Sequence, residues 1–138
     1  MQDSAALRNS IVSGNAAPTA PDCLGTINSG GYNLIGKQTG ECAFTSAPGD
    51  LLGVSARLGP LMGSPAYHPL SRGSPAIDGG NPLGCADWNG DPLTTDQRGA
   101  PRPVDGNRDG TPVCDIGAYE YDPSNDPLSY TFVPMMLR

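Results

Sequence analysis

The stretches NSIVSGN at residues 9–15 and NLIGKQTG at residues 33–40 resemble each other. Their alignment places Asn9 on Asn33, at a spacing of 24 residues, and it superimposes the isoleucines that follow. Each copy has a short apolar run followed by Gly or Asn turn residues. A period of this length with one strand-rich unit per repeat predicts the stacked coils of a β-solenoid, in which each coil buries its apolar side only against its neighbours. The two asparagines would then stack as a hydrogen-bonded ladder.

The composition agrees with a turn-rich all-β chain. The 138 residues fit one domain and include 19 glycines and 15 prolines, while only 16% of the residues are charged. Low charge and recurring apolar runs favour an ordered chain over a disordered one. Prolines at positions 60, 65, 69 and 75 exclude a long helix in that part of the chain.

The charge distribution argues against two classes of partner. The net charge is −6 and the eight Lys and Arg residues are scattered, so no basic patch is available to follow a nucleic acid backbone. No stretch approaches the roughly 20 apolar residues of a membrane-spanning helix. The first ten residues lack the cationic start and apolar core of a signal peptide, which leaves the compartment open.

The four cysteines are Cys23, Cys42, Cys85 and Cys114. There is no C-x-x-C pair and His68 is the only histidine, which argues against a zinc site. An even number of cysteines in a small, loop-rich chain favours disulfides and an oxidising compartment. Three pairings are possible, and we favour Cys23–Cys42 with Cys85–Cys114 because they join neighbours along the chain. The alternative is four buried free thiols in a cytosolic protein.

The C-terminal half divides into three parts. Residues 79–115 are mostly loop and need restraints such as a disulfide, ion pairs or a metal. Residues 116–121, IGAYEY, alternate in polarity and predict a strand. We expect residues 1–121 to form coils plus a cap, and residues 122–138 to form a linker with an apolar strand that docks on its own domain or on a partner's sheet edge. The candidate assembly residues are Tyr130, Phe132 and Val133.

Residues 105–110, DGNRDG, resemble the first half of a calcium-binding EF-hand loop. Hard oxygens stand at alternate positions and a glycine permits the sharp turn. The twelfth position is Ile116, where a glutamate is wanted. We therefore expect Ca²⁺ bound with a substitute closing ligand, and the alternative is an Asx-rich turn without metal. The candidate ligands are Asp105, Asn107, Asp109, Thr111 and Asp115.

A second group of charged residues recurs along the loop and the last predicted strand. An active site would need paired carboxylates around a cleft. We favour a structural role, with arginines binding carboxylates so that the long loop packs over the last coil. No nucleophile motif, phosphate loop or dinucleotide fingerprint occurs, so no enzyme activity is expected. The predicted structural ion-pair residues are Asp78, Asp96, Arg98, Arg102 and Glu120.

Five stretches carry a resemblance to a known family. LRNSIVSGN, DCLGTINSGGYNLIG, SRGSPAID, DQRGAPRPVD and CDIGAYEY occur in this order across most of residues 6–121. They resemble the signatures of bacterial extracellular right-handed parallel β-helix proteins of the choice-of-anchor Q type. The resemblance implies about two terminal coils, an irregular C-terminal cap, and a secreted or cell-surface protein that usually has no assigned catalytic activity.

We therefore expect an all-β fold: a short right-handed parallel β-helix with a disulfide-stapled cap. The expected function is structural, as a surface, adhesion or self-assembling filament subunit of the bacterial cell exterior. The expected partner is a second copy, bound through the exposed coil edge and the C-terminal strand. One alternative is a polysaccharide-binding module that uses Trp88 and Tyr67 as stacking platforms. The other is a fragment of a carbohydrate-active β-helix enzyme.

Overall fold

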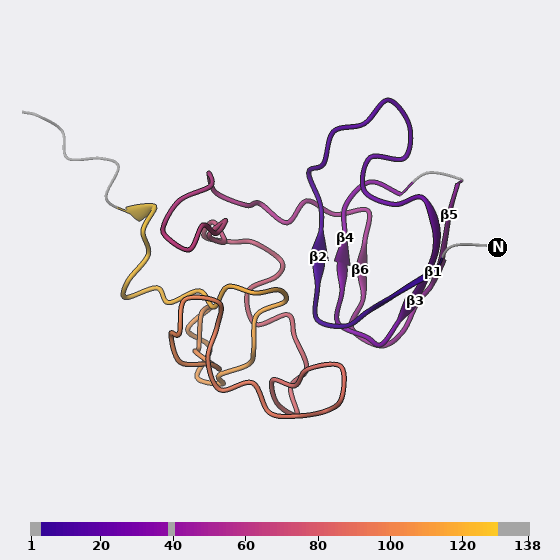
Figure 1. Cartoon of the computed structure of the whole chain (residues 1–138). Coiled ribbons are helices and arrows are strands. Elements are labelled where there is room, and N and C mark those ends of the chain that lie inside the picture. The colour runs from indigo at the N-terminus through magenta and orange to yellow at the C-terminus, as the bar shows by residue number, and fades with distance from the viewer. Residues whose placement is uncertain (1–3, 39–40, 130–138) are drawn as a thin grey trace, which may run out of the picture.

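The computed structural model describes residues 4–38 and 41–129. All six strands lie in the first half of the chain, and the described residues contain no α-helix (Figure 1). The segment after the last strand is irregular and holds only isolated antiparallel bridges. The strands are β1 (Ser4–Leu7), β2 (Ile11–Val12), β3 (Gly25–Ser29), β4 (Leu34–Ile35), β5 (Cys42–Thr45) and β6 (Leu51–Leu52).

The strands form two sheets, and the chain alternates between them. One sheet has the order β1-β3-β5 and the other β2-β4-β6, and every pair is parallel. Each connection between neighbouring strands of one sheet therefore passes through a strand of the other. The expectation of a strand-based fold with parallel pairing is confirmed at this level.

The register corrects the predicted repeat by one residue. Ile11 pairs with Leu34 and not with Ile35, so the spacing in this sheet is 23 residues (34 minus 11). In the other sheet Leu7 pairs with Ser29, a spacing of 22 (29 minus 7). The difference arises at the corners, because four residues separate Ser29 from Leu34 while three separate Leu7 from Ile11.

The predicted ladder of Asn9 on Asn33 is consequently wrong. The backbone N–H of Ser10 donates to Oδ1 of Asn33 at 3.0 Å, and the backbone N–H of Asn33 donates to Oδ1 of Asp50 at 2.9 Å. Asn33 is fully buried, so its amide needs such partners. A polar ladder exists, but its members are Ser10, Asn33 and Asp50.

The sheet β2-β4-β6 is covered on both faces. Successive side chains of a strand point to opposite faces. Ile35 packs with Ile27 and Cys23 in the core between the two sheets. Leu34 packs on the other face, in a core formed with residues of the C-terminal half. Both Leu34 and Ile35 are 0% exposed, which makes this short strand the centre of the fold.

The C-terminal half packs on a sheet face, and this differs from the expectation that it closes over the last coil. Leu70, Ala76 and Ile116 join Leu34 in the outer core, with Ile11 packed against them. Figure 1 shows this irregular segment beside the strands. The C-terminal half therefore covers the face of the sheet that carries Ile11, Leu34 and Leu51.

The predicted strand at residues 116–121 is wrong. The backbone there is irregular, and Gly117 has a φ of +100°, outside the extended region. Tyr119, Glu120 and Tyr121 are all buried, so the alternation read from the sequence does not separate an exposed face from a buried one. The backbone N–H groups of Glu120 and Tyr121 are bound by buried carboxylates in place of a neighbouring strand.

Two disulfides join the favoured partners. Cys23 and Cys42 have Cα atoms 5.3 Å apart and link the turn before β3 to the start of β5. Cys85 and Cys114 have Cα atoms 5.6 Å apart and close the long loop on itself. The predicted assembly residues Tyr130, Phe132 and Val133 lie outside the described residues.

Candidate functional site

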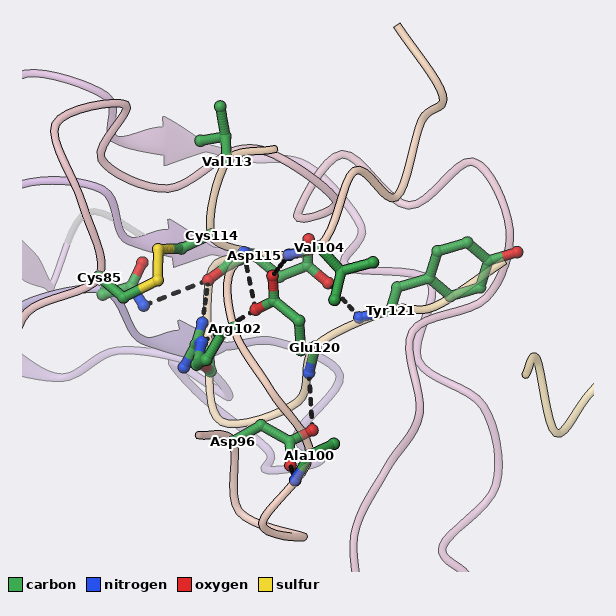
Figure 2. A network of polar contacts seen from close by, with 12 residues as sticks. Cys85, Asp96, Ala100, Arg102, Val104, Val113, Cys114, Asp115, Glu120 and Tyr121 are labelled. Carbon is green, nitrogen blue, oxygen red and sulfur yellow. Dashed lines mark hydrogen bonds and ion pairs between the residues drawn. A yellow bond between two sulfur atoms is a disulfide. The ribbon is translucent and has the colours of Figure 1, made fainter. Parts of the chain in front are cut away.

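The most elaborate polar arrangement of the described chain is a buried network around Glu120 and Arg102, which we call the latch (Figure 2). Nε of Arg102 donates to Oε2 of Glu120 at 2.9 Å, and the two side chains are 3% and 1% exposed. The same guanidinium donates to the backbone carbonyls of Asp115 at 2.7 Å and Gly117 at 3.2 Å. One arginine therefore binds the carboxylate and the backbone that precedes it.

Glu120 accepts further backbone donors. The N–H of Val104 donates to Oε1 at 2.9 Å and the N–H of Asp115 donates to Oε2 at 3.2 Å. Burial raises the pKa of Glu120, while these hydrogen bonds and the charge of Arg102 act in the opposite direction, and the net shift is upward. Ionised Glu120 thus depends on Arg102, as the sequence had suggested for a carboxylate at a buried position.

Asp96 forms the second ion pair of the latch. Its Oδ2 accepts Nη2 of Arg98 at 2.7 Å and Nε at 2.9 Å, and also the backbone N–H of Glu120 at 3.0 Å. Burial alone would raise the pKa of Asp96, but the hydrogen bonds from Glu120, Arg98 and Ala100 outweigh it and the pKa lies below its usual value. Asp96 is therefore held as a carboxylate that organises a turn.

Arg98 also connects the latch to two aromatic rings. Its guanidinium carbon lies 3.8 Å from the ring centroid of Tyr119 and 5.5 Å from that of Tyr67, and the two rings stack at 5.4 Å. Nη2 of Arg98 donates to the carbonyl of Glu120 at 2.7 Å. The arginine is thus both a cation–π partner and a hydrogen-bond donor.

Asp115 is the most perturbed acid of the network. It is fully buried, its Oδ1 accepts the backbone N–H of Asp78 at 2.8 Å, and its Oδ2 accepts that of Tyr121. Burial and the nearby charge of Glu120 raise the pKa of Asp115 to about 8, against the effect of the two hydrogen bonds. The sequence placed Asp115 among calcium ligands, and the structure places it inside the latch.

Asp78 pairs with no arginine among residues 4–38 and 41–129, although it was expected in the ion-pair group. Its carboxylate accepts the backbone N–H of Asn107 at 2.7 Å, with longer contacts of 3.4 Å from Gly106 and Val113. It therefore holds the loop that contains the calcium-like motif, through backbone contacts. Of the five predicted residues, four form the two ion pairs and Asp78 has this separate role.

The calcium-like motif forms a hydrogen-bonded turn. Oδ2 of Asp105 accepts the N–H of Gly110 at 2.9 Å, Oδ1 of Asn107 accepts that of Asp109 at 2.8 Å, and Oδ1 of Asp109 accepts that of Thr111 at 2.9 Å. This is the geometry of an Asx-rich turn. Within residues 4–38 and 41–129, no group of three or more His, Cys, Asp or Glu side chains is placed to hold a metal ion. Calcium binding by this loop stays a prediction.

A groove of about 1160 Å³ lies between the β2 side of the sheet and the C-terminal half. Tyr67 and His68 line it, but the ring of Tyr67 is stacked on Tyr119, and Nδ1 of His68 lies 2.8 Å from the carbonyl oxygen of Gly59. Trp88, the other proposed stacking platform, is 56% exposed and does not line this groove. The two aromatic residues therefore do not line this groove together.

Some structural residues gave no recognisable signal in the sequence. Asp22 is 7% exposed and accepts backbone N–H groups from Asn15 at 2.9 Å and Lys37 at 2.6 Å, which joins two corners of the chain. Ser10 and Asp50 of the polar ladder were missed because their role depends on the register. Ser10 and Asp50 align with Asn33 only when the extra residue in the corner between Ser29 and Leu34 is taken into account.

The comparisons with known proteins found no match: no family model, no curated protein and no solved structure is similar to the chain. In the part of the chain that the structure describes, no helix has the length and apolarity needed to cross a bilayer.

Proposed function

We propose that the two sheets are the terminal coils of a right-handed parallel β-helix, and that the chain is a non-enzymatic structural subunit of the bacterial cell exterior. The observation that carries the proposal is the alternation of strands between two parallel sheets. Each turn of the chain adds one strand to each sheet, as the coils of a solenoid do. The sequence resemblance to extracellular β-helix proteins supports the same interpretation.

The chemistry of the latch supports a structural role. A catalytic carboxylate must direct free oxygen lone pairs towards a substrate. In Asp96 and Glu120, both oxygens of each carboxylate accept donors from the protein itself. These carboxylates hold an irregular segment of backbone in one conformation, which suits a rigid cap better than a reacting site.

The two disulfides support an oxidising location. Cross-links of this kind persist in secreted and surface proteins and are rare in reducing compartments. Cys85–Cys114 also fixes the loop that leads into the latch. A protein that must resist unfolding outside the cell gains about 2–4 kcal/mol from each such bond.

Electron microscopy of the purified, oxidised protein tests the proposal. We expect ordered polymers, or ordered arrays on the native cell surface. Light scattering across a range of concentrations gives the assembly state in solution. A monomer at every concentration, together with no ordered material on cells, would overturn the structural-subunit proposal.

A further inference from the structure

A second pocket, of about 460 Å³, lies in the C-terminal half. It is formed by residues from three segments, 72–77, 106–108 and 121–129, and none of the described strands contributes to it. The four residues that form the two ion pairs of the latch do not line it either. Pockets that hold small molecules have volumes of about 300–1,000 Å³, so this pocket has the size of a ligand site.

The calcium-like turn contributes one wall of this pocket. A Cβ atom at position 106 would lie 2.6 Å from Cγ2 of Ile77, so glycine at this position lets the turn approach the chain before Asp78. The carboxylate of Asp78 accepts the backbone N–H of Asn107 at 2.7 Å and fixes the turn there. Asn107 and Arg108 then line the pocket. Protein atoms thus hold this wall in place.

Two arginines, Arg72 and Arg108, line the pocket from different segments, and both are exposed. Burial and the charge of Asp126 raise the pKa of Tyr121, while the charges of the two arginines act in the opposite direction. Both guanidinium groups therefore lie near the same phenol oxygen. Within residues 4–38 and 41–129, the side chain of Arg108 donates one hydrogen bond, to the carbonyl of Pro123 at 3.3 Å, and that of Arg72 donates none. Most N–H donors of the two guanidinium groups are thus available to a ligand.

Asp126 adds a hydrogen-bond acceptor to the same pocket. It is 8% exposed, its Oδ1 accepts the backbone N–H of Leu128 at 2.8 Å, and its Oδ2 accepts the O–H of Tyr121 at 3.2 Å. Figure 2 shows the side chain of Tyr121 extending away from the latch. Each oxygen of the Asp126 carboxylate has a further lone pair, which can accept a hydroxyl group of a ligand. The same negative charge disfavours a ligand that carries several negative charges.

These groups define the chemistry of the ligand. A carboxylate matches the planar donors of arginine and forms charge-assisted hydrogen bonds with them. An inorganic ion would leave much of the pocket to water, since one water molecule occupies about 30 Å³. Asp126 and Ser129 offer oxygen acceptors for hydroxyl groups, and Ile77 and Pro123 offer apolar contact for a ring. The pocket therefore suits a ring that carries one carboxylate and several hydroxyl groups.

We propose that this pocket binds a sugar acid of the hexuronate type. Its carboxylate lies on Arg72 and Arg108, and its hydroxyl groups are directed to Asp126 and Ser129. The inference adds a binding activity to the proposed structural function and does not depend on it.

Titration of the oxidised 138-residue chain with glucuronate, followed by nuclear magnetic resonance, tests the proposal. We expect saturable shifts of the backbone amide signals of Gly73, Gly106 and Asn107, which line the pocket, and none at Ser13 and Gly14, which line the larger groove. Glucose has the same ring without the carboxylate and should bind at least about tenfold more weakly. Added salt should weaken the binding of glucuronate, because both arginines are exposed to solvent.

Arg72→Gln and Arg108→Gln should each weaken glucuronate binding at least about tenfold, because each removes one cation from the carboxylate. The matched control is Lys37→Gln, which removes an exposed positive charge that does not line the pocket, and it should leave the affinity unchanged. All three positions are on the surface, so the variants should keep the melting temperature of the unaltered protein.

Absence of shifts at the pocket, or equal affinity of the Arg72→Gln and Lys37→Gln variants, would overturn the proposal. Equal binding of inorganic phosphate would assign a general anion site, and equal binding of N-acetylglutamate would assign a site for acidic peptides. Either result would overturn the sugar acid as the ligand. None of these outcomes changes the assembly seen by electron microscopy, so failure of the pocket and failure of the structural function are distinguishable.

Discussion

Removal of the Arg102 side chain should destabilise the fold more than any other single charge change in the cap. Arg102→Met keeps much of the apolar stem but deletes the donors to Glu120, Asp115 and Gly117. Glu120 is 1% exposed, so its carboxylate is left in the interior without a cation. The backbone carbonyls of Asp115 and Gly117 lose a donor in the same step.

The magnitude follows from the cost of an uncompensated buried charge. Breaking a buried pair by removing one partner costs about 3–5 kcal/mol. A chain of this length has an unfolding entropy of about 0.3 kcal/mol per degree, so the melting temperature should fall by about 10–17 °C. The matched control is Arg108→Met, because Arg108 is exposed and, among the described residues, its side chain donates a single long hydrogen bond, to the carbonyl of Pro123 at 3.3 Å. That change should cost less than about 0.5 kcal/mol.

The pH dependence separates this mechanism from a packing defect. Burial raises the pKa of Glu120, and loss of Arg102, which lowers it, must raise it further. An acid with a raised folded-state pKa favours folding below its unfolded pKa, and this contribution disappears as pH rises through the folded value. The loss of unfolding free energy caused by Arg102→Met should therefore be small near pH 4 and should increase towards pH 8.

Urea and thermal denaturation followed by circular dichroism between pH 4 and pH 8, with the disulfides intact, measure this deficit. The double variant Arg102→Met/Glu120→Leu should recover part of the lost stability, because it removes the charge along with its partner. If Arg102→Met lost no more unfolding free energy than Arg108→Met, or if its loss did not change with pH, the reasoning would be refuted.

Three further predictions concern the cap. Asp115 has a pKa of about 8 in the fold against an ordinary 3.8, so its contribution to the free energy of unfolding should be lost as pH rises from about 4 to 8. Asp115→Asn should flatten the dependence of stability on pH in this range, even if it lowers stability at every pH. An unchanged slope of stability against pH would contradict this prediction. Replacing Cys85 and Cys114 by serine should cost about 3–4 kcal/mol in urea denaturation, and a loss below about 1 kcal/mol would show that the loop is fixed without its disulfide. The predicted calcium site should give heat in titration calorimetry that Asp105→Ala abolishes, and absence of heat with the unaltered protein would end that prediction.

The latch was partly readable from the sequence. A glutamate among apolar residues needs a cation if it is buried, and Glu120 does have one. The sequence did not say which arginine it would be. The backbone contacts of Asp78 and Asp115 could not be foreseen for a related reason. Their oxygens bind backbone N–H groups from distant parts of the chain, and such partners leave no side-chain pattern in the sequence.

By itself, the sequence determined the strand-based class, the turn-rich corners and the favoured cysteine pairing, because these depend on neighbours along the chain. The tertiary structure decided the register, where a single extra residue at the corner before Leu34 moved Asn33 onto Ser10. It also decided that the C-terminal half covers a sheet face, and that residues 116–121 form no strand. Their backbone donors are taken by buried carboxylates, whose influence arises only once folding has removed them from water.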